Sequence, residues 1–210
     1  MSEIVDLEKL RSYFKEKLST FGVTPQGVDW NSSLAQELRF AQLSRIILSP
    51  ESYSLLDYGS GFGSLYNYLK AQGHSLRYVG FDFVLEMVER GKVLFANDPA
   101  CRFTTQETDL TEVDYSVASG IFNIRLQSHE PDWIDYVLRI LHKLNQLSRK
   151  GFAFNMLTRY SDPEYMKPNL YYADPGFYFD YCKRNFARNI ALLHDYGLYD
   201  FTILVRKELD

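Results

Sequence analysis

A glycine-rich turn with an aspartate in front of it is the part of this sequence best suited to chemistry. Residues 55–69 read LLDYGSGFGSLYNYL, in which Asp57 precedes glycines at alternate positions and a helix-like run follows. Glycine lets a ligand approach the backbone closely, and the free N–H groups at a helix start can bind its polar atoms. The stretch therefore predicts a nucleotide-binding turn between a strand and a helix.

The residue types in this turn argue against a dinucleotide. The GxGxxG fingerprint would need Gly or Ala at the position of Ser64. A carboxylate at Asp57 would repel a pyrophosphate, whereas it would attract a cationic group such as an amine. We therefore expect a nucleotide ligand that carries positive charge.

Two further aspartates follow strand-like runs. Asp82 ends the run YVGFD, 19 residues after Gly63, where a carboxylate can accept hydrogen bonds from both hydroxyls of a ribose. Asp109 ends the third run in TDL and could accept a hydrogen bond from an adenine amino group, although a turn aspartate is an equal alternative. Together with the glycine turn, these residues predict a nucleoside site.

The elements that must position these residues alternate between strands and helices. Such alternation indicates βαβ units and a parallel sheet covered on both faces. Two further strand-like runs at the end are separated by GLY, which predicts a terminal antiparallel hairpin. The expected strands lie at 54–59, 77–83, 101–110, 114–123 and 151–157, the helices at 63–72, 84–97 and 131–149, and the hairpin at 189–196 and 200–207.

Composition restricts the class of protein. The 210 residues suffice for one domain, and a net charge of −4 with no basic block argues against a nucleic-acid partner. No apolar run reaches the length of a membrane span, and the charged N-terminus does not resemble a signal peptide. Two cysteines give neither a disulfide framework nor metal-ligand spacing. We expect a cytoplasmic protein with no metal and no membrane partner.

The motifs LLDYGSGFG, YVGFDF, TDL and DYSVASGIFN, in this order, resemble the class I S-adenosylmethionine-dependent methyltransferase superfamily. The resemblance covers about residues 53–207 and implies a Rossmann-like three-layer α/β/α fold. Its seven-stranded sheet would be mostly parallel, with a reversed C-terminal hairpin. The chain would then be a single S-adenosylmethionine-binding domain, 1–210, with an N-terminal helical cap at 1–50.

The resemblance also implies a role for individual residues around S-adenosylmethionine. Asp57 and the turn would flank the methionine part, Asp82 the ribose, and the residues after the second to fourth strands the adenine and the sulfonium. The segment VDWNSSLAQELRF is similar to one in small bacterial members, in which Trp30 would cover the cofactor and Arg39 would reach its carboxylate. The implied cofactor residues are Trp30, Arg39, Asp57, Gly59, Ser60, Gly61, Asp82, Phe83, Asp109, Leu110, Ser119 and Gly120.

The acceptor of the methyl group is open at this stage. The Asn/Asp-Pro-Pro-Tyr signature of DNA and glutamine-amide methylation is missing, and SGIFN stands in its place. A small molecule is therefore the expected acceptor. Residues 157–187 are rich in Tyr and Phe, and a long segment of this kind predicts an aromatic lid over the site.

Two other functions fit the same motifs. If the lid excluded every acceptor, the α-amine of S-adenosylmethionine could attack its own γ-carbon, and the products would be azetidine-2-carboxylate and methylthioadenosine. Some resemblance to S-adenosylmethionine cyclases supports this, with Tyr172, Asn155 and Asp174 as the candidate catalytic residues near the amine. A non-catalytic nucleotide-binding module is the third alternative, although the binding motifs are all present.

Overall fold

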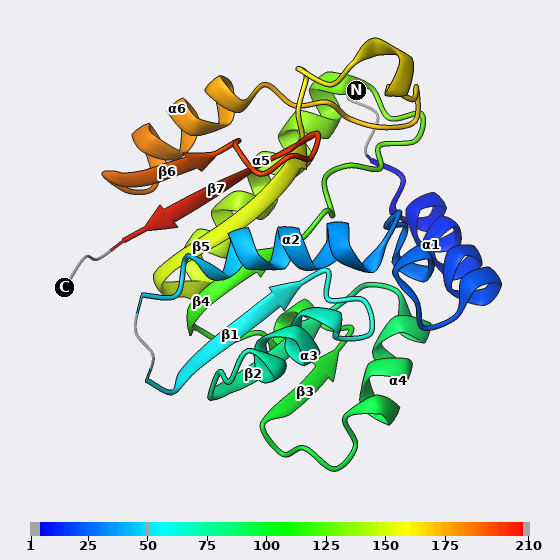
Figure 1. Cartoon of the computed structure of the whole chain (residues 1–210), viewed down its shortest axis with the longest axis vertical. Coiled ribbons are helices and arrows are strands. Elements are labelled where there is room, and N and C mark those ends of the chain that lie inside the picture. The colour runs from blue at the N-terminus through cyan, green and yellow to red at the C-terminus, as the bar shows by residue number, and fades with distance from the viewer. Residues whose placement is uncertain (1–4, 49–50, 208–210) are drawn as a thin grey trace.

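The computed structural model describes residues 5–48 and 51–207. Seven strands form one sheet in the order β3-β2-β1-β4-β5-β7-β6 (Figure 1). Their bounds are β1 Tyr53–Tyr58, β2 Leu76–Phe81, β3 Cys101–Thr104, β4 Val113–Ala118, β5 Ser148–Leu157, β6 Asn189–Leu193 and β7 Asp200–Arg206.

The direction of the strands confirms the predicted fold class. Strands β1 to β5 pair in parallel, whereas β7 runs antiparallel to both β5 and β6. Parallel strands end at one edge of a sheet, so the residues after β1, β2 and β4 meet there. That edge is where the candidate site lies.

Helices cover both faces of the sheet. The helices are α1 Leu7–Phe21, α2 Ser33–Ser44, α3 Ser64–Ala71, α4 Leu85–Leu94, α5 Glu130–Leu147 and α6 Pro175–Asn185, with short 3-10 turns η1 Pro25–Val28, η2 Glu107–Asp109 and η3 Pro163–Tyr165. One core joins the sheet to α5 and α6, and a second joins it to α2 and α3. Alternate strand residues serve the two cores, as Phe154 and Ala153 of β5 do. The result is the expected three-layer sandwich.

The two N-terminal helices lie in different places: α1 lies beyond the edge where the strands end, and α2 packs on one face of the sheet. The Ser32 hydroxyl accepts a hydrogen bond from the Ala35 N–H and so caps α2, which begins one residue later. In Figure 1, α1 lies beyond the arrowhead of β1, while α2 crosses in front of the sheet. Of the two helices, α1 therefore faces the strand ends.

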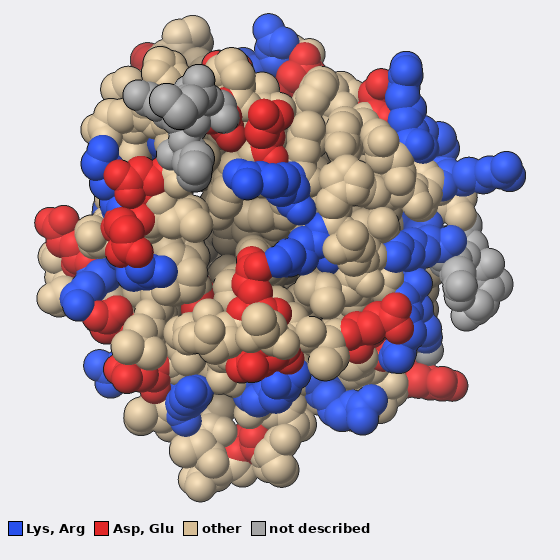
Figure 2. Space-filling model, turned by 180° about the vertical axis from the view of Figure 1, so that it is seen from behind, with Lys and Arg blue, Asp and Glu red and all other residues tan. Residues whose placement is uncertain are grey.

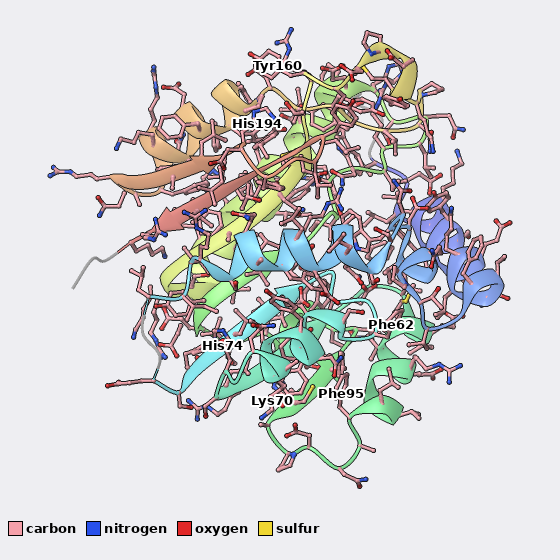
Figure 3. The ribbon with its side chains drawn as sticks, in the orientation of Figure 1. Phe62, Lys70, His74, Phe95, Tyr160 and His194 are labelled. Atoms are coloured by element: carbon pink, nitrogen blue, oxygen red, sulfur yellow. The ribbon has the colours of Figure 1, made fainter. Side chains whose placement is uncertain are left out.

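The segment 157–187, the expected lid, bonds to the loop after β4 through residues 169–171. Its second half forms α6, which contacts β6 and β7 and so belongs to one of the two helical layers. Tyr178 and Cys182 of α6 are fully buried in the core, where apolar burial holds the helix on the sheet. Tyr160, from the first half, lies beside His194, with the two ring centroids 6.1 Å apart, and lies far from Phe62 of the glycine turn (Figure 3).

The surface seen from behind mixes both signs of charge. Lys and Arg side chains are interspersed with Asp and Glu on this face, with no broad patch of one sign (Figure 2). Within residues 5–48 and 51–207, no helix is long and apolar enough to cross a membrane.

Candidate functional site

A pocket opens where β1, β2 and β4 end. Its walls come from the loops after these strands, from α3, and from α1, η1 and α2. The empty space between the walls, including the part open to solvent, is about 1030 Å³. This is the size of a small-molecule or cofactor site.

The glycine turn forms the floor of the pocket and lies close against its neighbours. Gly59 has φ +82°, and a Cβ there would lie 2.2 Å from Cγ2 of Ile121, so a larger residue would not fit. The N–H groups of Gly59 and Ser60 both donate to the carbonyl of Phe81, at 2.7 and 3.0 Å. The turn is thereby attached to the end of β2, and α3 begins at Ser64.

Asp82 joins the glycine turn to the next loop. Its carboxylate accepts the Gly61 N–H at 2.8 Å and the Val84 N–H at 2.9 Å, and the residue is only 7% exposed. Burial raises the pKa of Asp82 to about 6, while the two backbone N–H groups oppose that rise. Each carboxylate oxygen keeps a lone pair for a second donor, so both hydroxyls of a diol can bind here.

Asp57 is the less satisfied of the two buried carboxylates. It is 3% exposed, and its Oδ2 accepts a hydrogen bond from the Tyr78 hydroxyl at 2.6 Å. Among the described residues, nothing donates to its buried Oδ1. Burial raises the pKa of Asp57 to about 7. A cationic group in the pocket would favour the charged form of this carboxylate.

The structure gives Arg39 a partner other than the one expected. Its Nε donates to Oδ1 of Asp200 at 3.1 Å, Nη2 donates to the other carboxylate oxygen, and Nη1 donates to the Ala35 carbonyl. With its donors engaged in this way, the guanidinium has no free fork for a cofactor carboxylate. It instead lies 4.3 Å from the ring centroid of Trp30.

Trp30 lines the pocket and lies over Gly120. Gly120 has φ +72°, and a Cβ there would come within 2.3 Å of Cη2 of Trp30. The indole is therefore held between this glycine and the Arg39 guanidinium. This fixed ring forms one wall of the pocket.

The loop after β4 contributes a second buried polar atom without a partner. Ser119 and Gly120 both line the pocket, and no described residue bonds the Ser119 hydroxyl. Asn155 lies behind them: its Oδ1 accepts the Gly120 N–H at 2.7 Å, and it is outside the pocket wall. Asn155 thus positions the loop, which differs from the expected contact with the reacting groups.

Phe83 also lines the pocket, but four other expected residues do not. Asp109 accepts a hydrogen bond from the Thr104 hydroxyl at 2.7 Å, and Leu110 packs against the core below α5. The Tyr172 hydroxyl accepts the Lys167 N–H at 2.9 Å. Asp174 caps α6 and pairs with Arg159, and neither it nor Tyr172 lines this pocket.

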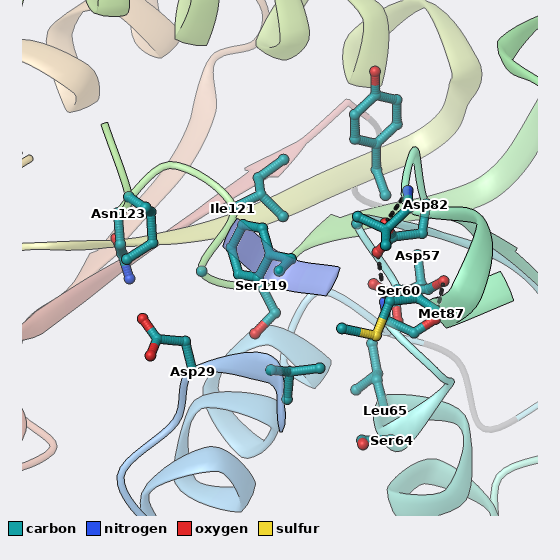
Figure 4. Close-up of a pocket in the computed structure, with 18 of the residues that line it drawn as sticks. Asp29, Asp57, Ser60, Ser64, Leu65, Asp82, Met87, Ser119, Ile121 and Asn123 are labelled. Carbon is teal, nitrogen blue, oxygen red and sulfur yellow. Dashed lines mark hydrogen bonds between the residues drawn. The ribbon is translucent and has the colours of Figure 1, made fainter. Parts of the chain in front are cut away.

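Sequence reasoning gave no binding role to several polar residues of the pocket, although Asn123 ends the SGIFN motif. Asp29, Gln36 and Asn123 all line it (Figure 4 labels Asp29 and Asn123). Gln36 lies one helical turn before Phe40, which also lines the pocket, and this i, i+4 spacing was the available signal. Asp29 had no such signal, because it lies in an irregular turn.

A curated relative resembles most of the chain. "Putative methyltransferase Rv1506c" of Mycobacterium tuberculosis (strain ATCC 25618 / H37Rv) is 47% identical over 163 residues, which is 78% of this chain and 98% of the relative. No protein-family model matches the sequence.

Solved structures share the fold at low sequence identity. The Burkholderia thailandensis 1,6-didemethyltoxoflavin-N1-methyltransferase, bound to 1,6-didemethyltoxoflavin and S-adenosylhomocysteine, matches with a TM-score of 0.64 at 21% identity, over 96% of this chain and 88% of that one. The magnesium protoporphyrin IX methyltransferase of Synechocystis PCC 6803, with bound S-adenosylhomocysteine, matches with a TM-score of 0.62 at 12% identity, over 97% and 100% of the two chains.

Proposed function

Because this chain belongs to the methyltransferase family of its mycobacterial relative, we propose that it transfers a methyl group from S-adenosylmethionine to a small molecule. One observation carries the cofactor assignment. Two buried carboxylates, Asp57 and Asp82, lie at the ends of neighbouring strands and border one pocket, and no residue of 5–48 or 51–207 donates to one oxygen of Asp57. S-adenosylmethionine offers a ribose diol and two cationic groups, which are the complements of such a pair.

The residues around the pocket fit the parts of this cofactor. In the proposal, Asp82 accepts hydrogen bonds from the ribose hydroxyls, and Asp57 with the glycine turn binds the methionine part. Trp30 and Phe83 supply aromatic faces, which attract cations as well as flat rings. The helical elements α1, η1 and α2 form the cap over the cofactor, as Trp30 and Gln36 line the pocket from that side.

The cofactor supplies a methyl group on a positively charged sulfur, so the chain has little bond-making chemistry of its own to perform. The acceptor atom forms a bond to the methyl carbon as the methyl–sulfur bond breaks, and that electron pair stays on sulfur. A proton lost by the acceptor passes to solvent. The chain's share is to hold both molecules in line and to exclude water.

We infer that the acceptor is a small molecule and not a nucleic acid. The chain carries a net charge of −4, and among the described residues no Lys or Arg lines the pocket. A phosphate backbone would need such cations.

The cyclase alternative has no structural support. Of its three candidate residues, Tyr172 and Asp174 bond within the segment 157–187, and Asn155 lies behind Gly120. A base or acceptor for the α-amine would therefore have to come from elsewhere, and we do not propose this reaction.

Mass spectrometry of small molecules tests the proposed function. The purified protein is incubated with S-adenosylmethionine, first alone and then with a library of small molecules. If the protein transfers methyl groups, S-adenosylhomocysteine should form together with a product. The mass of this product should exceed that of one of the small molecules by about 14 Da, the mass of a methylene group. Methylthioadenosine formed at catalytic rates without any acceptor would contradict the proposal and revive the cyclase.

A further inference from the structure

We propose that the methyl acceptor binds between Asp29 and Asn123 and is a small, flat nitrogen heterocycle with an N–H group beside a carbonyl or ring-nitrogen lone pair. A cyclic amide is the simplest compound with such an edge. This inference rests on the proposed function, because it assigns the substrate class of the same pocket.

Asn123 offers a hydrogen-bond donor to the pocket. The residue is 6% exposed and lines the cavity. Its Oδ1 accepts the Leu157 N–H at 3.0 Å, which fixes the amide so that Nδ2 is the free end. Within residues 5–48 and 51–207 no hydrogen bond engages Nδ2, so this end of the amide is available to an acceptor on a ligand in the pocket.

Asp29 offers the matching acceptor. The Tyr13 hydroxyl donates to its Oδ2 at 2.8 Å, and the Lys17 ammonium lies 2.6 Å from Oδ1. Both contacts hold the carboxylate in one orientation. The carboxylate oxygens keep lone pairs beyond these two contacts, so Asp29 can also accept an N–H from the acceptor molecule.

The two residues face the pocket from the side away from the cofactor residues. In Figure 4 the Asn123 amide and the Asp29 carboxylate point toward one another, while Asp57, Ser60 and Asp82 gather on the opposite side. Ser119 and Ile121 lie between the two groups. The pocket thus has one half for the cofactor and a second half with a donor beside an acceptor.

The remaining walls of the second half restrict the shape and charge of its ligand. The indole of Trp30 and the apolar side chains of Leu10 and Ile124 line the pocket, and they favour a flat, mostly apolar body. As no described Lys or Arg lines it, a phosphate or carboxylate ligand would be left without a counter-charge. A neutral heterocycle meets both conditions.

Two matched probes test this assignment. Quinolin-2(1H)-one has the N–H and carbonyl edge, and 1-methylquinolin-2(1H)-one differs only by a methyl group in place of the hydrogen. Each is titrated into ¹⁵N-labelled protein saturated with S-adenosylhomocysteine. The chain has two tryptophans, so the indole N–H signal of Trp30 reports binding. That of Trp133, which is fully buried and donates to the Phe122 carbonyl, serves as the internal control.

We expect the Trp30 signal to shift with quinolin-2(1H)-one and the affinity to be at least about tenfold lower for the N-methyl compound, because a hydrogen bond to a charged group is lost. Asn123→Asp keeps an oxygen for the Leu157 N–H but replaces the donor, and Asp29→Asn removes the charge. Each substitution should lower the affinity for quinolin-2(1H)-one by about tenfold, while the affinity for S-adenosylhomocysteine stays unchanged.

The possible failures are distinguishable. Failure of the wild-type protein to bind S-adenosylhomocysteine would overturn the proposed function and this inference with it. Normal binding of S-adenosylhomocysteine, together with equal affinities for the two probes or no Trp30 shift with either, would overturn this inference alone. Unchanged probe affinity in both folded variants would do the same.

Discussion

Folding buries the carboxyl groups of Asp57 and Asp82 and removes the water that would stabilise their charged forms. Burial is the main cause that raises the pKa of Asp57 to about 7 and that of Asp82 to about 6. Tyr78 donates to Asp57 and lowers its pKa, but not enough to cancel the burial. Groups with such shifts are frequent at functional sites, where a ligand supplies the missing partner.

The unfolding free energy should therefore depend on pH in the absence of ligand. Between about pH 4, near the carboxyl pKa of an unfolded chain, and about pH 7, the folded state holds more protons than the unfolded state. Stability from these two groups is thus largest at low pH and falls as the pH rises through this window. Urea unfolding of the wild type and of the Asp57→Asn variant measures this pH dependence of the unfolding free energy. The variant should lack the share of the pH dependence that comes from Asp57. An identical slope in the two proteins would contradict the assignment.

Cofactor affinity should show the opposite trend. A cationic ligand group beside Asp57 requires the charged carboxylate, so binding releases a proton below about pH 7. The affinity for S-adenosylmethionine should rise from about pH 5 to about pH 7 and then level off. Calorimetry in buffers of different ionisation enthalpy counts the protons released. The Asp57→Asn variant should release fewer protons when it binds S-adenosylmethionine. The same number of released protons in both proteins would exclude Asp57 as the partner of the cationic group.

Among the elements, α2 and β7 are joined by the buried ion pair of Arg39 and Asp200. The pair holds the guanidinium against Trp30, and through it the wall of the pocket. Its partners lie 161 residues apart in the sequence. The periodicity of α2 could place Arg39 toward the sheet, but it could not identify an aspartate at the start of a distant strand.

Asp200→Ala should lower the unfolding free energy by about 3–5 kcal/mol, because it leaves the Arg39 guanidinium buried without a counter-charge. The double variant Arg39→Met, Asp200→Leu should recover much of that loss. Asp180→Ala is the matched control, since it breaks an exposed pair with Arg184 that is worth about 0–1 kcal/mol. Equal losses for the buried and the exposed pair, in urea unfolding, would contradict the role given to Arg39.

The segment 157–187 yields a second prediction for an element. Tyr172→Phe removes a hydroxyl that accepts the Lys167 N–H within this segment, outside the pocket wall. We expect a small loss of stability, about 1 kcal/mol, and unchanged affinity for S-adenosylmethionine. Thermal unfolding and calorimetry on one preparation measure both. A tenfold loss of affinity would show that the segment reaches the cofactor after all.

At the scale of the whole molecule, the fold could be predicted from the sequence. The second half of the pocket, at Asp29 and Asn123, could not. The alternation of strands and helices predicted the parallel part of the sheet, and the two final strand-like runs joined by GLY predicted the antiparallel hairpin. Asp57 and Asp82 could be predicted to lie in one site because they are at the ends of β1 and β2, and parallel strands bring their ends together. The richness of α6 in aromatic residues could not show which of them are buried, and Tyr178 packs into the core.

The central claim is that this pocket binds S-adenosylmethionine through Asp82, and calorimetric titration tests it most directly. Wild-type protein, Asp82→Ala and Asp114→Ala are titrated with S-adenosylmethionine; Asp114 is a control that accepts hydrogen bonds from Ser54 at the other end of the sheet. The account predicts one site per chain, affinity at least about tenfold lower in Asp82→Ala, and unchanged affinity in the control. No binding to the wild type, or equal affinity in folded Asp82→Ala, would contradict it.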